Sequence, residues 1–153
     1  MTEASSSPRR VGMQARLIVV GLSVLVHLGS WIAPALQFDM TSGGPWIPRG
    51  WEVAFLGVQA LLVGNFGWLA NVFYAPSLIA ALLAWWRTAA TFAAAAVLVG
   101  FHSLALIGKE VPADEGNVNQ MVLVHLRAGF YLWMSSMVVM VLASLWHRRR
   151  ETA

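Results

Sequence analysis

The chain has 153 residues, of which 58% are hydrophobic and only 11% are charged. A soluble globular domain carries roughly 25% charged residues, so this composition excludes an ordinary water-soluble domain. The formal net charge of +3 resides in basic residues beside the hydrophobic blocks; we therefore interpret them as topology signals and expect no nucleic-acid partner. The absence of cysteine excludes disulfides, thiolate metal sites and thiol nucleophiles.

Four hydrophobic blocks are long enough to cross a bilayer: Leu17–Leu36, Trp51–Trp86, Thr88–Ile107 and Met121–Trp146. A spanning helix needs about 20 residues, because in lipid a helix must pair its own backbone amides. The first block exceeds the apolar core of a signal peptide, so we expect it to remain as a mature helix. We predict an all-α integral membrane protein, a four-transmembrane-helix bundle over residues 13–147, with a disordered cytoplasmic tail at 1–12 and a basic cytoplasmic tail at 148–153.

The second block is too long for one crossing and contains breaks. The run Gly64-Asn65-Phe66-Gly67 interrupts it, and Pro76 predicts a kink further on. In one interpretation Trp51–Val63 is a short interfacial or re-entrant helix that precedes the crossing Trp68–Trp86. In the other both halves cross, which gives five helices and places the basic C-terminal tail outside. The charge bias favours four crossings.

Basic residues set the predicted orientation. We place both termini in the cytoplasm of a bacterium. Most basic residues then lie on the cytoplasmic side of the inner membrane, namely Arg9, Arg10, Arg16, Arg87, Arg148, Arg149 and Arg150, and only Arg49, Lys109 and Arg127 lie on the outer side. Tryptophan favours the headgroup level because its ring is apolar and its N–H donates a hydrogen bond. We expect one belt at Trp31, Trp46 and Trp51 and another at Trp85, Trp86 and Trp146.

Small residues mark the expected contact faces between helices. The short connection at Arg87-Thr88 predicts that the second and third crossings are antiparallel neighbours. Stripes of small residues let helices approach closely in lipid; one such stripe comprises Ala89, Ala93, Ala96, Gly100 and Ser103, and another comprises Gly129, Ser136 and Ala143. The methionines Met134, Met137 and Met140 suit either protein contact or a lipid-facing surface.

Two histidines lie at membrane depth, where an ionisable side chain is a candidate for function. At 1.5 Å per residue, His27 lies about 16 Å along a helix from Arg16, and His102 lies about 22 Å along a helix from Arg87. Two histidines from different helices can ligate haem iron, so His27 and His102 are candidate haem ligands. Histidine as an ordinary interhelical hydrogen-bond partner is the simpler interpretation.

A second group of polar residues is expected on the outer side. Glu52, Asn71, His125 and Arg127 could form a polar cluster under the re-entrant segment, with Gln59 and Asn65 nearby. Such a cluster would suit a small oligomeric transporter. For Arg127 the simpler interpretation is that it snorkels to the interface and pairs with lipid phosphate or with Glu110, Asp114 or Glu115.

The sequence contains no convergent nucleophile, acid and base, so we do not expect an enzyme. The favoured interpretation is an accessory or scaffold component of a membrane complex. Its expected partners are the lipid bilayer and either other membrane subunits or further copies of this chain. We expect no metal site and no cofactor, with haem as the stated alternative.

Overall fold

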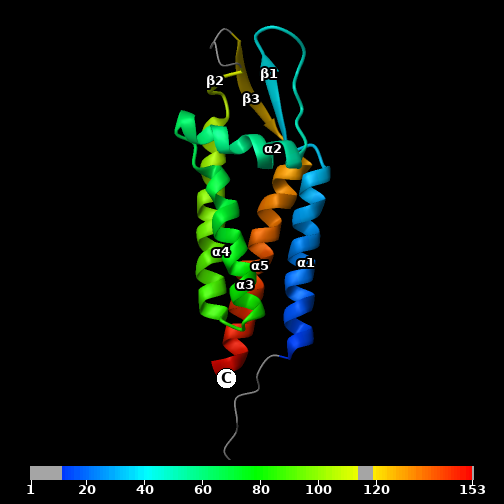
Figure 1. Cartoon of the computed structure of the whole chain (residues 1–153), viewed down its shortest axis with the longest axis vertical. Coiled ribbons are helices and arrows are strands. Elements are labelled where there is room, and N and C mark those ends of the chain that lie inside the picture. The colour runs from blue at the N-terminus through cyan, green and yellow to red at the C-terminus, as the bar shows by residue number, and fades with distance from the viewer. Residues whose placement is uncertain (1–11, 114–118, 153) are drawn as a thin grey trace, which may run out of the picture.

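A computed structural model describes residues 12–113 and 119–152, and it is an elongated helical bundle with a small sheet at one end (Figure 1). Nearly all of the predicted disordered tail at 1–12, and the acidic residues Asp114 and Glu115, lie outside these described residues. The chain is mostly helical. The prediction of an all-α protein is wrong in one respect, because three strands accompany the helices.

Four helices form the bundle: α1 (Met13–Ile32), α3 (Ala70–Leu82), α4 (Trp86–Gly100) and α5 (Ala128–Thr152). Within the described residues, three stretches are long and apolar enough to span a membrane: Met13–Ile32, Ala128–Arg150 and Trp86–Leu106. In the last of these, the 3₁₀ turn η3 (Phe101–Leu106) continues α4. α3 and the preceding turn η2 (Gly67–Leu69) make a shorter apolar segment, Gly67–Leu82.

Buried alanines contribute to the packing of α3 against α4. The chain reverses within Leu83–Trp85, where Ala84 adopts a positive φ of 61°, so that the two helices pack as antiparallel neighbours, as predicted. The small-residue stripe predicted for α4 is buried at Ala89, Ala93, Ala96 and Gly100, and Ser103 is half-buried. Without large side chains on this face, the helices can approach closely, which in lipid supplies much of their association free energy.

α5 lies at the centre of the packing, in contact with both α1 and α4. Gly129 and Ser136 of its predicted stripe are buried, and Ala143 is half-buried. Met137 and Met140 are fully buried in the core with the alanines of α4, and Met134 is 8% exposed in a separate core beneath the sheet. The lipid-facing interpretation of these methionines is therefore wrong, and their flexible side chains fill the space that small residues leave.

The sheet is antiparallel, in the order β1 (Leu36–Met40), β3 (Gln120–Leu126), β2 (Glu110–Pro112). β1 pairs with β3 with Leu36 opposite Leu126 and Met40 opposite Met121, and the register shifts between Gln37 and Phe38. Leu36, Phe38 and Leu123 point into a second hydrophobic core, which also contains Phe130 of α5.

Two of the strands overlap blocks that the sequence analysis assigned to spanning helices: β1 begins at the last residue of one block, and all of β3 but Gln120 lies in another. The block Leu17–Leu36 ends as a helix at Ile32, because Pro34 disfavours helical geometry in the preceding residue, and Ala33 is extended with ψ 149°. The block Met121–Trp146 is likewise divided, with Gln120–Leu126 in β3 and the helix starting at Ala128. His125 and Arg127 therefore do not lie on a spanning helix.

The segment after β1 comprises α2 (Gly50–Leu56) and the 3₁₀ helix η1 (Gly57–Val63). Figure 1 shows α2 lying across the end of the bundle and not along it. Gly64 ends η1 with a φ of 74°, a left-handed conformation that glycine adopts without steric cost. The predicted break at Gly64 and the predicted short helix before α3 are both confirmed, whereas a long fifth helix is not formed by the described residues.

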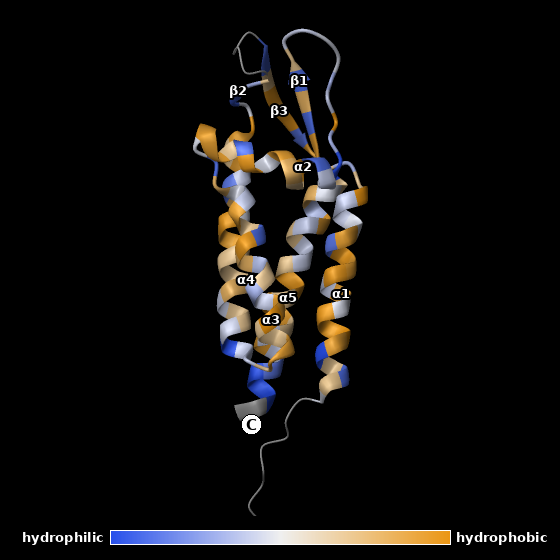
Figure 2. Ribbon diagram, viewed as in Figure 1, coloured by the Kyte–Doolittle hydropathy of each residue, from blue (hydrophilic) through white to orange (hydrophobic). Residues whose placement is uncertain are grey.

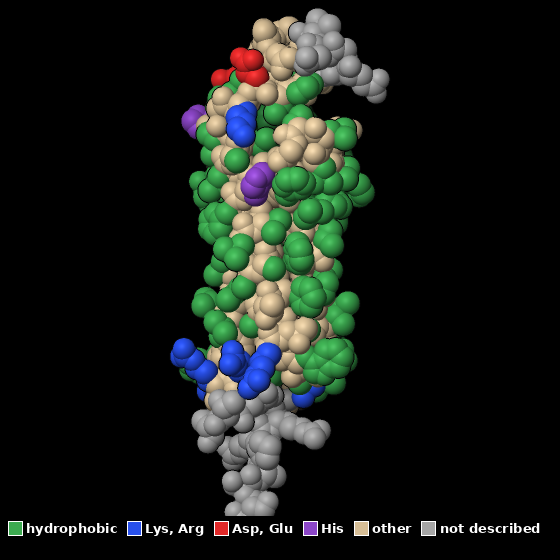
Figure 3. Space-filling view, turned by 90° about the vertical axis from the view of Figure 1, so that its left-hand side faces the viewer, with side chains coloured by type: hydrophobic (Ala, Val, Ile, Leu, Met, Phe, Trp, Pro, Cys, Tyr) green, Lys and Arg blue, Asp and Glu red, His purple; other side chains and the backbone are tan. Residues whose placement is uncertain are grey.

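Hydrophilic residues gather at both ends of the bundle (Figure 2), and the two ends differ in charge (Figure 3). What we call the basic end holds Arg16, Arg87 and the last turns of α5 with Arg148, Arg149 and Arg150. The sheet end holds charges of both signs, namely Asp39, Glu52 and Glu110 with Arg49, Lys109 and Arg127. α5 continues as a helix past the predicted boundary at residue 147.

Tryptophans at the basic end behave differently from one another. Trp85 and Trp146 are exposed, as a belt requires, and the Arg150 guanidinium lies 4.9 Å from the centre of the Trp146 ring. Trp86 is buried and stacks on His147 with ring centres 4.6 Å apart, so its predicted place in the belt is wrong. Core packing takes precedence there because the ring faces α5 and not the surroundings.

Candidate functional site

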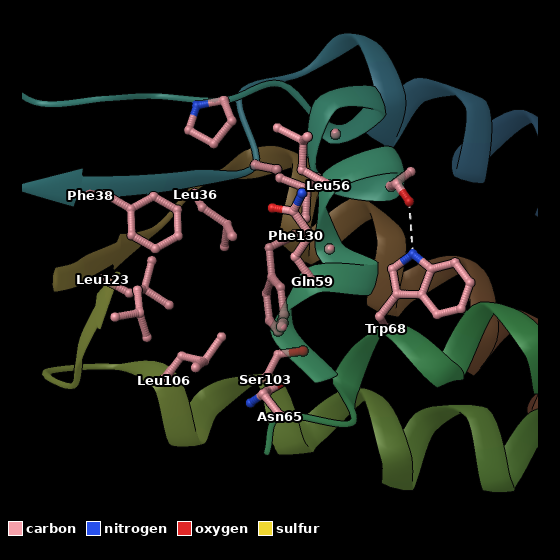
Figure 4. A pocket seen from close by; sticks show the side chains of 18 of the residues that line it. Leu36, Phe38, Leu56, Gln59, Asn65, Trp68, Ser103, Leu106, Leu123 and Phe130 are labelled. Carbon is pink, nitrogen blue, oxygen red and sulfur yellow. Dashed lines mark hydrogen bonds between the residues drawn. The ribbon is translucent and has the colours of Figure 1, made fainter. Parts of the chain in front are cut away.

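A cavity of about 560 Å³ lies where the sheet meets the bundle. Its walls come from the inner face of β1 and β3, from α2 and η1, and from the ends of the helices below. Figure 4 shows Leu36, Phe38, Leu106 and Leu123 on the strand side of the cavity and Trp68 on the opposite side. Apolar pockets of this size with a few polar groups are typical small-molecule sites.

The polar groups in the cavity are uncharged. None of the described residues that line it carries a charge or an imidazole; the polar side chains are Ser30, Gln59, Asn65, Asn71 and Ser103, together with the indole rings. Such a lining can bind an uncharged, mainly apolar ligand. It holds no carboxylate, imidazole or amine that could act as a general acid or base.

Two of the lining amides are used to hold the walls. Asn65 donates a hydrogen bond of 2.8 Å to the carbonyl of His102 and accepts one of 3.0 Å from the amide of Gly67. Asn71 donates to the carbonyl of Trp68 and accepts from the indole N–H of Trp133 at 2.8 Å. These bonds connect η2 and α3 to η3 and α5, so the amides stabilise the shape of the cavity.

Two other polar side chains of the lining are not used in hydrogen bonds among the described residues. Among the described residues, the amide of Gln59 and the hydroxyl of Ser103 have no hydrogen-bond partner, and both groups line the cavity. Gln59 is exposed and Ser103 is half-buried. An amide and a hydroxyl left unpaired inside an apolar wall are available to a ligand's own neutral polar atoms.

Part of the cavity rim is apolar. Trp31, Leu56 and Val63 line the cavity and are also exposed, at 37%, 46% and 45% of their surface, so their side chains stand between the cavity and the surroundings. Trp68 holds this region together, because its indole N–H donates a 2.7 Å hydrogen bond to the carbonyl of Ala54 in α2.

The polar cluster predicted from sequence is only partly present. Asn71 lines the cavity, as do the neighbouring Gln59 and Asn65, but Glu52, His125 and Arg127 do not. Glu52 accepts a 2.6 Å hydrogen bond from the amide of Arg49 and caps α2. His125 is exposed on β3, and Arg127 donates to the side-chain oxygen of Gln37, a partner that the sequence analysis did not name.

The two candidate haem ligands have different neighbours. His27 stacks on Tyr74, with ring centres 4.7 Å apart, and its Nδ1 lies 3.1 Å from the hydroxyl of Ser136. The Nδ1 of His102 accepts a hydrogen bond of 3.2 Å from the amide of Phe66. His27 fits the simpler interpretation of an interhelical partner, and the joint role of His27 and His102 as haem ligands stays a prediction.

A buried polar node inside the bundle was missed by the sequence analysis. The hydroxyl of Ser23 on α1 lies 2.6 Å from the Tyr74 hydroxyl on α3 and donates a 2.8 Å hydrogen bond to the carbonyl of Ser136 on α5. With His27 it joins three helices. The available signal was the presence of these hydroxyls within otherwise apolar blocks, but spacing alone does not say which of them meet.

Comparison with protein-family models, with curated proteins and with solved structures finds no match to this chain.

Proposed function

We propose that the chain crosses the bacterial inner membrane four times, with the basic end in the cytoplasm and the sheet end outside. The supporting observation is that five described basic residues, from α1, α4 and α5, gather at one end of the bundle, whereas three, Arg49, Lys109 and Arg127, lie at the other end with the acidic residues Asp39, Glu52 and Glu110. The segment Gly67–Leu82 is the shortest crossing, at about 24 Å, and the apolar residues up to Trp86 extend it towards the roughly 30 Å of the hydrocarbon core.

Within this topology, the protein acts as a non-catalytic binding component of the membrane. The observation that carries this proposal is the apolar cavity at the sheet end, whose lining offers neutral hydrogen-bonding groups and no acid or base among the described residues. This function deepens the accessory role expected from the sequence, in which the protein works with other membrane subunits or with further copies of itself.

Site-directed thiol protection tests the proposal. Because the chain has no cysteine, a single Ala60→Cys variant places one thiol in the cavity wall, and Val58→Cys places one on the same 3₁₀ helix outside the cavity. Both variants are reconstituted in nanodiscs and modified with a small methanethiosulfonate reagent. An uncharged alkylphenol is then added as the ligand probe.

The expected result is that the alkylphenol slows modification of Ala60→Cys by roughly ten-fold and leaves Val58→Cys unchanged, because only the cavity thiol is covered by a bound molecule. Equal slowing of both thiols would indicate a general effect on the bilayer. That result, or no slowing at all, would contradict the binding function.

A further inference from the structure

We infer that the cavity receives an acyl chain of a bilayer phospholipid, which enters sideways from the outer leaflet past η1. This inference rests on the proposed function and names its ligand. Three observations support it: the position of the cavity behind an exposed apolar helix, the apolar rim, and the absence of charge in the described lining.

The segment α2–η1 stands between the cavity and the surroundings. It lies across the end of the bundle (Figure 1). Apart from Gln59, its exposed side chains are apolar. Phe55 is 69% exposed and Leu62 is 88% exposed, which in water would be an unfavourable surface. A short apolar helix in this position is suited to the boundary between headgroups and acyl chains.

Residues on the other side of the same segment face the cavity, among them Val53, Ala54 and Ala60. The cavity is thus separated from the outer leaflet by the thickness of one short helix. At its rim stand Leu56 and Val63, which are both exposed and part of the lining. A chain that passes from the leaflet into the cavity therefore meets mainly apolar side chains, with the uncharged amide of Gln59 among them, and no charged group of the described lining has to lose water on the way.

The lining also indicates which part of a lipid enters. No described lining residue could pair with a phosphate or an amine, so a charged headgroup is expected to remain outside. The amide of Gln59 and the hydroxyl of Ser103, which have no hydrogen-bond partner within the described part of the chain, can donate to an uncharged acceptor such as an ester carbonyl. An acyl chain with its ester satisfies both parts of the lining.

Photo-cross-linking from within the bilayer tests the inference. Nanodiscs of phosphatidylcholine receive a small share of a phosphatidylcholine with a diazirine in the middle of one acyl chain. After irradiation, cross-linked residues are located by peptide mass spectrometry. The reporter is Leu123, which lines the cavity from β3 and is 1% exposed, so a lipid chain reaches it only from inside the cavity. Leu25, 68% exposed on α1, serves as the lipid-facing reference.

Cross-links at both Leu123 and Leu25 are the expected result in the wild-type chain. Ala60→Phe fills the cavity wall and should lower the Leu123 signal by roughly ten-fold while Leu25 is unchanged. Val58→Phe adds the same ring to the exposed side of η1 and should keep both signals. If Ala60→Phe does not fold, the cross-linking of Leu123 and Leu25 in the wild-type chain still tests whether the acyl chain enters the cavity.

Other outcomes would overturn the inference. Cross-linking at Leu25 without Leu123 would exclude entry of the phospholipid chain. A diazirine-bearing free fatty acid is run in parallel, and labelling of Leu123 by the fatty acid alone would assign the cavity to a free ligand. If the alkylphenol protects Ala60→Cys but the phospholipid does not label Leu123, the binding function stands and only the lipid is wrong.

Discussion

The indole N–H of Trp133 on α5 donates a hydrogen bond of 2.8 Å to the side-chain oxygen of Asn71 on α3, and both residues line the cavity. α3 and α5 are not neighbours along the chain, so this bond ties two distant segments together beneath the sheet. Asn71 also donates to the carbonyl of Trp68, which fixes its amide in the orientation that accepts from Trp133.

Trp133→Phe removes the indole donor and leaves the oxygen of Asn71 without this partner. We expect a loss of about 1 kcal/mol in the free energy of unfolding, as is usual for one interhelical hydrogen bond. Unfolding by sodium dodecyl sulfate in mixed micelles measures it, with Trp85→Phe at an exposed position as the control. In a double-mutant cycle with Asn71→Leu the two changes should be coupled, and strict additivity would contradict the bond's importance.

Gly67 approaches Ser103 so closely that no side chain fits between them. A Cβ at Gly67 would overlap the hydroxyl oxygen of Ser103 and lie 3.0 Å from its Cβ. Gly67→Ala should therefore destabilise the protein by about 1 to 3 kcal/mol through overpacking. Adding Ser103→Gly should restore part of the lost stability, because it removes both the hydroxyl oxygen and the Cβ of Ser103.

Gly44→Ala is the matched control for this clash, since a Cβ there meets nothing within 4 Å. Thermal unfolding in detergent compares the variants. A Gly67→Ala variant as stable as Gly44→Ala would show that η2 and η3 are not packed as described.

Met140 and Leu142 lie on the same helix with opposite surroundings. Met140 is fully buried, whereas Leu142 is 62% exposed. Met140→Ala should cost about 2 to 5 kcal/mol, because the space it leaves cannot be refilled, and Leu142→Ala should cost little. Chemical unfolding measures both, and equal effects would mean that the methionines do not form the core of the bundle.

The proposed orientation can be tested with single cysteines. Gly44→Cys lies in the exposed loop after β1, and Thr88→Cys is exposed at the start of α4, at the other end of the bundle. A membrane-impermeant maleimide applied to intact spheroplasts should label Gly44→Cys, and should label Thr88→Cys only after the membrane is permeabilised. The reverse labelling pattern would show that the chain has the opposite orientation, with the cavity on the cytoplasmic side.

Hydrophobicity by itself determined the apolar helices, the stripe of small residues on α4 and the break before α3, because each depends on local composition and helical spacing. The sheet was missed although Leu36–Met40 alternates between buried and less buried positions, because the apolar residues of β3, and Leu36 of β1, were assigned to the blocks of the adjoining helices. Its pairing joins segments far apart in the sequence, and no local pattern specifies such a register.

The cavity was decided by tertiary structure alone. Gln59, Asn65 and Asn71 were singled out from the sequence, but their neighbours Leu36, Leu123 and Phe130 come from β1, β3 and α5, which only folding brings together. The same holds for Arg127, which donates a hydrogen bond to the side chain of Gln37, 90 positions away in the sequence, whereas Glu52 makes a local cap with the amide of Arg49. Composition fixes the solvent in which the helices are stable, whereas the shape of a site depends on which side chains meet across the fold.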